Sequence, residues 1–225
     1  MKEVSIVICP FENNDYFKRV FNHIIVRTRY DLSQVEIIIV DNNTDPELKR
    51  DIAEFVHENG ELCSMKYIEN NNEGQLAQAT NRAIEAADSR WLVYLCANDT
   101  YIYDPRWLQY LVGNMSEEEY NAGFRIAGTV TPWPNHLPPD KQFHVQGTVF
   151  IAFTEYMKNN AYSPEYPFEY CDVMHSARCL QQGYHLKHLP RICSHMGQAT
   201  KEWHDGNKQS KQYLVAHVLG LAQFL

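Results

Sequence analysis

The chain has 225 residues, 44% of them hydrophobic, which is enough to form one large domain with a sizeable core. The formal net charge is -8, and no Lys- or Arg-rich stripe could neutralise a phosphate backbone, which excludes a general nucleic-acid binder. No apolar run approaches the length of a transmembrane segment, and the N-terminus lacks a signal-peptide pattern. We therefore expect a soluble, cytoplasmic protein.

The six cysteines are scattered without the CxxC spacing of a zinc site. Several of them lie in apolar runs that are typical of strands. We expect buried free thiols in a reducing compartment.

The first half of the sequence alternates apolar runs with amphipathic segments. Val4–Cys9 and Val35–Val40 are continuous apolar runs, typical of strands covered on both faces. Between them, apolar residues from Phe17 to Ile25 recur at helical spacing after a capping Asp15. The alternation continues with a helix at 46–57, a strand at 65–69, a helix at 75–87 and a strand at 91–96. This order predicts a Rossmann-like parallel sheet with right-handed crossovers.

Beyond Gly113 the rhythm changes. We expect strands at 124–130, 149–153, 185–189 and 191–194, a helix at 172–182 and a terminal amphipathic helix from about Gln209. A proline-rich loop at 131–139 contains Trp133, an aromatic surface suited to stacking on a sugar, although a plain surface loop is the alternative. The terminal helix is expected to pack on the core, to form a dimer contact or to contact a longer parent chain.

Polar residues follow several of the predicted strands. They are Pro10, Phe11 and Glu12 after the first strand, Asp41 and Asn42 after the second, and Asn98 and Asp99 after the strand at 91–96. Ligands of open α/β sheets bind beyond the carboxyl ends of the strands, where a carboxylate can hold a ribose, a base or a phosphate-bound metal. Asp41 has a second interpretation, because Asp often starts a turn.

The helix at 75–87 offers a further group of candidates. Gly74 precedes it, and a glycine there lets backbone amides approach a phosphate closely. Arg82 on this helix either contacts a diphosphate or is simply exposed. The glycine triplet of the dinucleotide fingerprint is missing, so NAD and FAD are not expected. Asp172 and His175 have a spacing that can place two metal ligands on one helix face.

Five segments, taken in order, resemble a GT-A glycosyltransferase of family 2. They are 4–10, 36–42, 72–81, 97–99 and 168–172, and the similarity extends roughly from Val4 to His195. The resemblance implies an α/β fold with a Rossmann-like, mostly parallel sheet flanked by helices and a smaller mixed acceptor-side portion. It implies a single domain, 1–225, with a nucleotide-sugar-binding half at 1–113 and an acceptor-binding half with the terminal helix at 114–225.

The resemblance also implies roles for individual residues. The nucleotide site would comprise Pro10, Phe11, Glu12, Asp41, Asn42, Gly74, Asn81 and Asn98. Asp99 and His195 would hold Mn²⁺ or Mg²⁺ bound to the diphosphate. Asp172 would be the general base, with Glu169 and Trp133 on the acceptor side. The segment 195–206 would form a lid over the donor, or else a plain connector.

These roles imply inverting transfer of a hexose from a nucleotide diphosphate sugar to a carbohydrate hydroxyl. The segment Asn98–Tyr101 resembles rhamnosyltransferases, which favours UDP- or dTDP-linked rhamnose or glucose. Two family acids are replaced, by Ala97 and Cys171, so a degenerate nucleotide-sugar-binding domain without turnover is one alternative. A sugar nucleotidyltransferase is another, although no glycine-rich loop follows the first strand.

Overall fold

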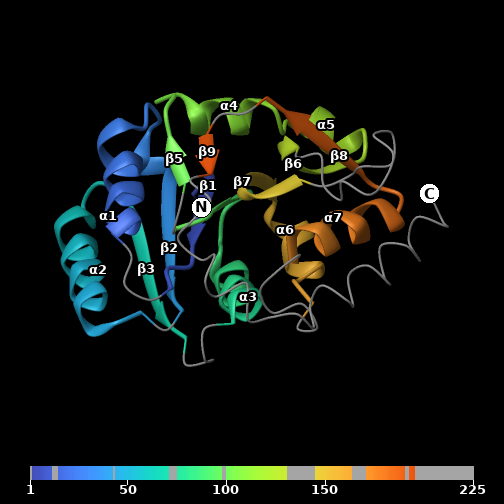
Figure 1. Cartoon of the computed structure of the whole chain (residues 1–225). Coiled ribbons are helices and arrows are strands. Elements are labelled where there is room, and N and C mark those ends of the chain that lie inside the picture. The colour runs from blue at the N-terminus through green and yellow to red at the C-terminus, as the bar shows by residue number, and fades with distance from the viewer. Residues whose placement is uncertain are drawn as a thin grey trace.

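The computed structural model describes residues 2–11, 15–42, 44–70, 75–97, 100–130, 145–163, 171–190 and 193–195. Within these ranges, seven strands form one sheet in the order β3-β2-β1-β4-β7-β6-β8, and two short strands form the pair β5-β9. Helices cover the large sheet (Figure 1). Four of the six strand pairings in this sheet are parallel, so the fold is a mostly parallel α/β sheet flanked by helices. The predicted fold class is confirmed.

The first four strands are parallel. They are β1 (Val4–Ile8), β2 (Val35–Asp41), β3 (Ser64–Glu69) and β4 (Trp91–Leu95). Every residue of β1, β2 and β4 is buried, which explains the continuous apolar runs of these strands. Because the strands are parallel, their carboxyl ends all lie at one edge of the sheet.

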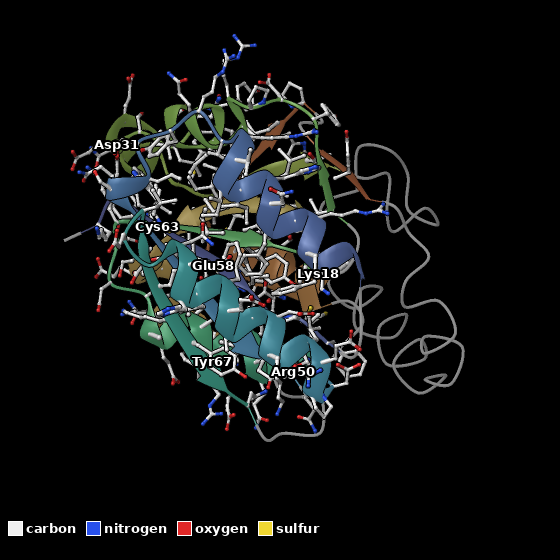
Figure 2. All side chains as sticks on the ribbon, turned by 90° about the vertical axis from the view of Figure 1, so that its left-hand side faces the viewer. Lys18, Asp31, Arg50, Glu58, Cys63 and Tyr67 are labelled. Atoms are coloured by element: carbon white, nitrogen blue, oxygen red, sulfur yellow. The ribbon has the colours of Figure 1, made fainter. Side chains whose placement is uncertain are left out.

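Two helices pack side by side over one face of these strands. Figure 2 views them, α1 (Asp15–Asn22) and α2 (Pro46–Asn59), in front of the sheet. Phe21 of α1 and Phe55 of α2 contact each other edge to face, with ring centroids 4.2 Å apart. Asp45 caps α2, since its carboxylate accepts a 2.8 Å hydrogen bond from a backbone N–H of the first turn.

The region expected to be helical near Ile25 differs in detail. After α1, the chain continues as a π-helical turn, η1 (His23–Arg27), through which Ile24 still reaches the core. A 3₁₀ turn, η2 (Leu32–Gln34), then leads into β2.

Other helices lie over the opposite face. They are α3 (Leu76–Ala86), α6 (Thr154–Asn159) and α7 (Cys171–Gln181). α3 packs on β1 and β2 and also contacts α6, whereas α7 packs on β7 and β8 (Figure 1). α3 therefore belongs to the first half of the chain but touches the second.

The second half of the chain extends the same sheet. Its strands are β6 (Phe124–Val130), β7 (Val145–Phe153) and β8 (His185–Leu189). β7 runs antiparallel between β4 and β6, and its predicted start at Val149 is four residues too late. The first part of β7 contains Gly147 and Thr148, which interrupt the apolar pattern that marks the rest of the strand.

Short elements complete the described chain. They are β5 (Thr100–Ile102), α4 (Trp107–Gly113), α5 (Glu117–Asn121) and β9 (Cys193–His195). No strand at 100–102 and no helix at 107–113 or 117–121 was predicted, because these elements are too short to show a period. The expected terminal helix and the loop 131–139 lie outside the described residues. In the ranges that the structure describes, no helix is long and apolar enough to cross a membrane.

Candidate functional site

Polar residues at the ends of the first three strands are joined by hydrogen bonds. The N–H of Asn42 donates to the carbonyl oxygen of Pro10 over 2.9 Å, and the N–H of Asn70 donates to that of Asp41 over 3.0 Å. The side chain of Asn70 in turn donates to the amide oxygen of Asn42 over 3.2 Å. The structure thus brings together the predicted nucleotide-site residues Pro10, Asp41 and Asn42.

Asp41 is a buried carboxylate with several partners. Its Oδ1 accepts the N–H of Thr44 over 2.8 Å, and its Oδ2 accepts the hydroxyl of Tyr67 over 3.0 Å and lies 3.1 Å from Nζ of Lys49. Burial alone raises the pKa of Asp41, but the bonds from Thr44, Lys49 and Tyr67 outweigh it and lower the pKa below its usual value. The hydrogen bond from Thr44 is the contact expected if Asp41 starts a turn, which was the second interpretation of this residue.

Arg82 is exposed, and its guanidinium holds the end of β3. Its Nη1 donates to the carbonyl oxygen of Glu69 over 2.8 Å and to the side-chain oxygen of Asn70 over 3.0 Å. The arginine therefore fastens the same strand end that carries the asparagines, which favours a supporting role over a diphosphate contact.

The end of β4 lies against β7. The N–H of Cys96 donates to the carbonyl oxygen of Thr148 over 2.8 Å, and the hydroxyl of Thr100 donates to the same oxygen over 3.5 Å. Asn98 and Asp99, which come between them in the sequence, lie outside the described residues. Thr100 and His195 are paired residues of β5 and β9. The backbone pairing thus places His195 beside the residue that follows Asp99.

Asp172 lies in the first turn of α7 and is bonded to β7. Its Oδ2 accepts the N–H of Gly147 over 2.8 Å, and its Oδ1 accepts the N–H of Val173 over 2.8 Å. Gly147 is adjacent to Thr148, the residue that contacts the end of β4. The structure therefore brings the predicted general base close to the strand end that precedes Asp99. Glycine permits this close approach, since a Cβ at this position would lie 3.1 Å from Oδ2 of Asp172 and would push the carboxylate away by a few tenths of an ångström.

Asn81 is on α3, and its side chain binds the backbone of Tyr162. Nδ2 donates to the carbonyl oxygen of Tyr162 over 2.9 Å, and the N–H of Tyr162 donates to Oδ1 over 2.8 Å. The sequence contains no signal for this contact, because the two residues are 81 positions apart. The predicted contact of Asn81 with ribose and diphosphate is not tested by the structure.

Four cysteines are protonated thiols at neutral pH. Burial raises the pKa of Cys9 to about 12 and also raises that of Cys171, next to Asp172. Cys63 and Cys179 are likewise free thiols with pKa values raised to about 11 by burial. The prediction of buried free thiols is confirmed for Cys9, Cys63 and Cys179, whereas Cys171 is a half-buried free thiol. Cys171 is neutral and cannot replace the missing family carboxylate as a charged group.

His175 is buried and contacts two aromatic rings. Its ring centroid lies 5.0 Å from that of Tyr162 and 5.8 Å from that of Tyr156. Burial lowers its pKa to about 3, and neither ring nitrogen has a hydrogen-bond partner among the described residues. Within the same part of the chain, no group of three or more His, Cys, Asp or Glu side chains is arranged to bind a metal. His175 therefore packs as a neutral ring.

Several predicted site residues remain predictions. Glu12, Gly74, Asn98, Asp99, Trp133 and Glu169 lie outside the described residues, and for His195 the structure describes the backbone alone. Phe11 is described next to Pro10, after the end of β1.

Comparison with known sequences gives one family. The sequence model of the family described as "Glycosyl transferase family 2" matches residues 5–172, from β1 to Asp172 in the first turn of α7. No curated protein sequence matches the chain significantly.

Solved structures share the fold at low sequence identity. The mannosyltransferase PcManGT from Pyrobaculum calidifontis, in complex with GDP-Man and Mn²⁺, has a TM-score of 0.73 and 13% identity, covering 89% of this chain and 59% of its own. S. aureus TarS 1-349 in complex with UDP has a TM-score of 0.59 and 15% identity, covering 79% of this chain and 54% of its own. S. aureus TarS has a TM-score of 0.65 and 12% identity, covering 97% of this chain and 42% of its own. The chain thus spans 42% to 59% of the length of these structures.

Proposed function

Because the chain belongs to glycosyl transferase family 2, we propose that it is an inverting hexosyltransferase. It moves the hexose of a nucleotide diphosphate sugar to a hydroxyl group of a carbohydrate acceptor. The observation that carries this proposal is the position of Asp172, which is held by Gly147 of β7 beside the end of β4. A carboxylate at this edge of the sheet can accept a proton from the acceptor hydroxyl.

Asp172 is the proposed general base. Hydrogen bonds from the N–H groups of Gly147 and Val173 reach its Oδ2 and Oδ1 and fix the carboxylate plane. The thiol of Cys171 beside it has a pKa raised by burial and is neutral, so Cys171 cannot serve as the base in its place.

The nucleotide site is proposed at the ends of β1, β2 and β3. Asn42 is bonded there to Pro10, and Asp41 to Asn70. We also include Phe11, Glu12, Gly74 and Asn98, because they follow the ends of β1, β3 and β4 in the sequence. The donor is proposed to be UDP- or dTDP-linked rhamnose or glucose. GDP-mannose is a necessary comparison, since the similar PcManGT was solved with it.

Asp99 and His195 are the residues proposed to hold Mn²⁺ or Mg²⁺. The pairing of Thr100 with His195 fits this proposal, because it places His195 beside the residue that follows Asp99 in the sequence. When bound, the ion would offset the negative charge that develops on the departing diphosphate. PcManGT was solved with Mn²⁺, which supports the proposal.

The first test is calorimetric titration of UDP, dTDP, GDP and their hexose conjugates, with Mn²⁺ and then with EDTA. We expect one nucleotide to bind in a metal-dependent way, and Asp99→Ala to weaken that binding. Nucleotide binding that does not depend on the metal, or that is unchanged in Asp99→Ala, would contradict the proposed metal site. If the well-folded protein binds none of these nucleotides or nucleotide sugars, the proposed nucleotide-sugar function is wrong.

The second test concerns the base. Asp172→Asn keeps an oxygen that can accept the N–H of Gly147 but loses the basic carboxylate, so we expect kcat to fall about 100-fold or more with donor binding little changed. Glu155→Gln, which removes an exposed carboxylate on α6, is the matched control and should keep full activity. Nucleotide release from the donor, with a panel of carbohydrate acceptors, measures both.

The binding domain without turnover remains the second candidate function, favoured by the buried Ala97 and the neutral Cys171. It predicts that the wild-type protein binds nucleotide but releases none from any donor, with or without acceptor. Release that falls in Asp172→Asn excludes it.

A further inference from the structure

The side chain of Asn81 connects the donor half of the chain to the helix that carries Asp172. We propose that Asn81 is a positioning residue, which acts through the backbone of Tyr162 and the ring of His175 to fix the place of Asp172. The proposal rests on the proposed function, in which Asp172 is the general base. It differs from the role as a nucleotide contact that the family resemblance implies for Asn81.

The first step of the connection is the pair of hydrogen bonds between Asn81 and Tyr162. The side-chain amide satisfies both the N–H and the carbonyl group of Tyr162, at 2.8 and 2.9 Å. Tyr162 is buried, so losing the amide would leave both backbone groups without this partner away from water. These two hydrogen bonds fix the backbone of Tyr162 in position relative to α3.

The second step is the contact between the rings of Tyr162 and His175. The ring planes are inclined by 32° with centroids 5.0 Å apart, and Tyr156 also contacts His175 edge to face. His175 is 96% buried. The contact between the two rings couples the position of Tyr162 to that of α7. It depends on packing alone, so it does not require His175 to be protonated.

The third step is the first turn of α7. His175 is three residues after Asp172, so the two side chains lie one helical turn apart. Asp172 in this turn and Ser176 in the next turn accept hydrogen bonds from the N–H groups of Gly147 and Val145 on β7. His175 ties the first turn through Tyr162 to α3, so the turn is held from two directions.

The connection matters because α3 packs on β1 and β2, whose ends carry the proposed nucleotide site. Asn81 therefore helps to set the distance between the donor and the base. An error of about 1 Å in such a distance can cost about 100-fold in rate. A positioning role predicts a loss of kcat without loss of nucleotide affinity.

The test uses Asn81→Ala and Asn81→Asp, with Glu85→Ala on an exposed position of the same helix as control. Asn81→Asp keeps the size of the side chain and the acceptor for the N–H of Tyr162, but it loses the donor to the carbonyl group of Tyr162. It replaces Asn81→Ala in the test if that variant does not fold. We expect kcat to fall about 10- to 100-fold, with the nucleotide Kd changed less than about twofold. The control should match the wild type in both.

Hydrogen exchange supplies a readout that does not depend on activity. In both Asn81 variants, amides of residues 171–175 should exchange faster, while those of β1 stay unchanged. Tyr162→Leu keeps the backbone pairing with Asn81 but removes the ring contact, so it should speed exchange at 171–175 as well. The double variant should be no worse than the more affected single variant, because both changes break one connection.

Each alternative has a distinct result. A loss of nucleotide affinity in Asn81→Ala with unchanged exchange at 171–175 would overturn the proposal and make Asn81 a nucleotide contact. Unchanged exchange with unchanged affinity would overturn it as well. If Asp172→Asn keeps full activity, the proposed function of Asp172 fails, and the exchange data then show separately whether Asn81 holds α7.

Discussion

At the scale of single residues, Asp41 links stability to pH. Its folded pKa lies below the usual value of 3.8, because the bonds from Thr44, Lys49 and Tyr67 outweigh the effect of burial. A lowered pKa means that the carboxylate stabilises the fold fully above about pH 3.8, and that this contribution is lost as the pH falls through the folded value.

We expect Asp41→Asn to lower the free energy of unfolding at pH 7 by about 1–3 kcal/mol, since it replaces a charged acceptor of buried donors. Urea unfolding of both proteins between pH 7 and pH 3 measures the difference, which should shrink below pH 3.8. A difference that is constant across this range would show that the charge of Asp41 is not what stabilises the fold.

Gly147 gives a second prediction at this scale. A Cβ at this position would lie 3.1 Å from Oδ2 and 3.3 Å from Cβ of Asp172, so Gly147→Ala must displace Asp172 by a few tenths of an ångström. With Asp172 as the base, we expect kcat to fall about 10-fold or more while nucleotide binding stays unchanged. Gly113→Ala, whose added Cβ meets nothing within 4 Å, is the control. Equal activity of the two variants would argue against a demanding geometry at Asp172.

The candidate site was only partly predictable at the residue scale. Asp41 and Asn42 could be placed because they directly follow an apolar run whose end is unambiguous. The bonds of Asp172 to Gly147 and of Asn81 to Tyr162 could not, because each joins residues 25 or 81 positions apart. Such contacts depend on strand order, which the pattern of a single strand does not contain.

At the scale of elements, Glu36 joins three strands to the end of α3. Its carboxylate accepts the hydroxyl of Ser5 on β1 and the N–H of Asp88 after α3, and it lies 3.0 Å from Nζ of Lys66 on β3. Glu36 itself is 2% exposed and is the second residue of β2. A single buried side chain thus fixes the spacing of these elements at the edge of the sheet opposite the site.

We expect Glu36→Ala to lower the free energy of unfolding by about 2–3 kcal/mol, because Ser5 and the N–H of Asp88 lose a buried partner. Asp88→Ala should have little effect, since its side chain is 78% exposed and water replaces it. Chemical denaturation of both variants measures the contrast. Similar losses in the two variants would show that the ion pair with Lys66, and not the buried acceptor, carries the stability.

Elements with a strong period were predicted closely, and short ones were missed. The bounds of β6 and β8 agree with prediction, and α2 begins at the predicted Pro46 because Asp45 and Pro46 form a clear helix start. β5 has only three residues, and its place depends on pairing with β9. Its existence is therefore a consequence of tertiary structure.

At the scale of the whole molecule, the two halves of the chain share one sheet. β4 belongs to the first half and β7 to the second, and they pair over five residues. The sequence predicted that the regular alternation of strands and helices ends after Gly113. It did not predict that β7 is antiparallel to β4, because side-chain patterns do not encode strand direction. The pairing places the proposed base of the second half against the strand ends of the first.

One row of buried residues crosses the boundary between the halves. Ile37 of β2 is paired with Ile6 of β1, Ile6 with Val93 of β4, and Val93 with Ile151 of β7. Ile6, Ile37, Val93 and Ile151 are fully buried. Because this row is continuous, we propose that the halves unfold as one cooperative unit, as expected for a single domain.

Ile37→Val tests this cooperativity by removing one buried methyl group far from β7. It should cost about 0.5–1.5 kcal/mol, and the slowest-exchanging amides of β7 should lose the same free energy as those of β1. Ile151→Val should reciprocally speed exchange in β1 and β2. Native-state hydrogen exchange measures both variants. If each substitution sped exchange in its own half only, the boundary near Gly113 would separate two domains, and the sheet would be an interface between them. If β1, β2 and β7 instead lose the same free energy in both variants, the position of Asp172 depends on the stability of the strands that form the proposed nucleotide site.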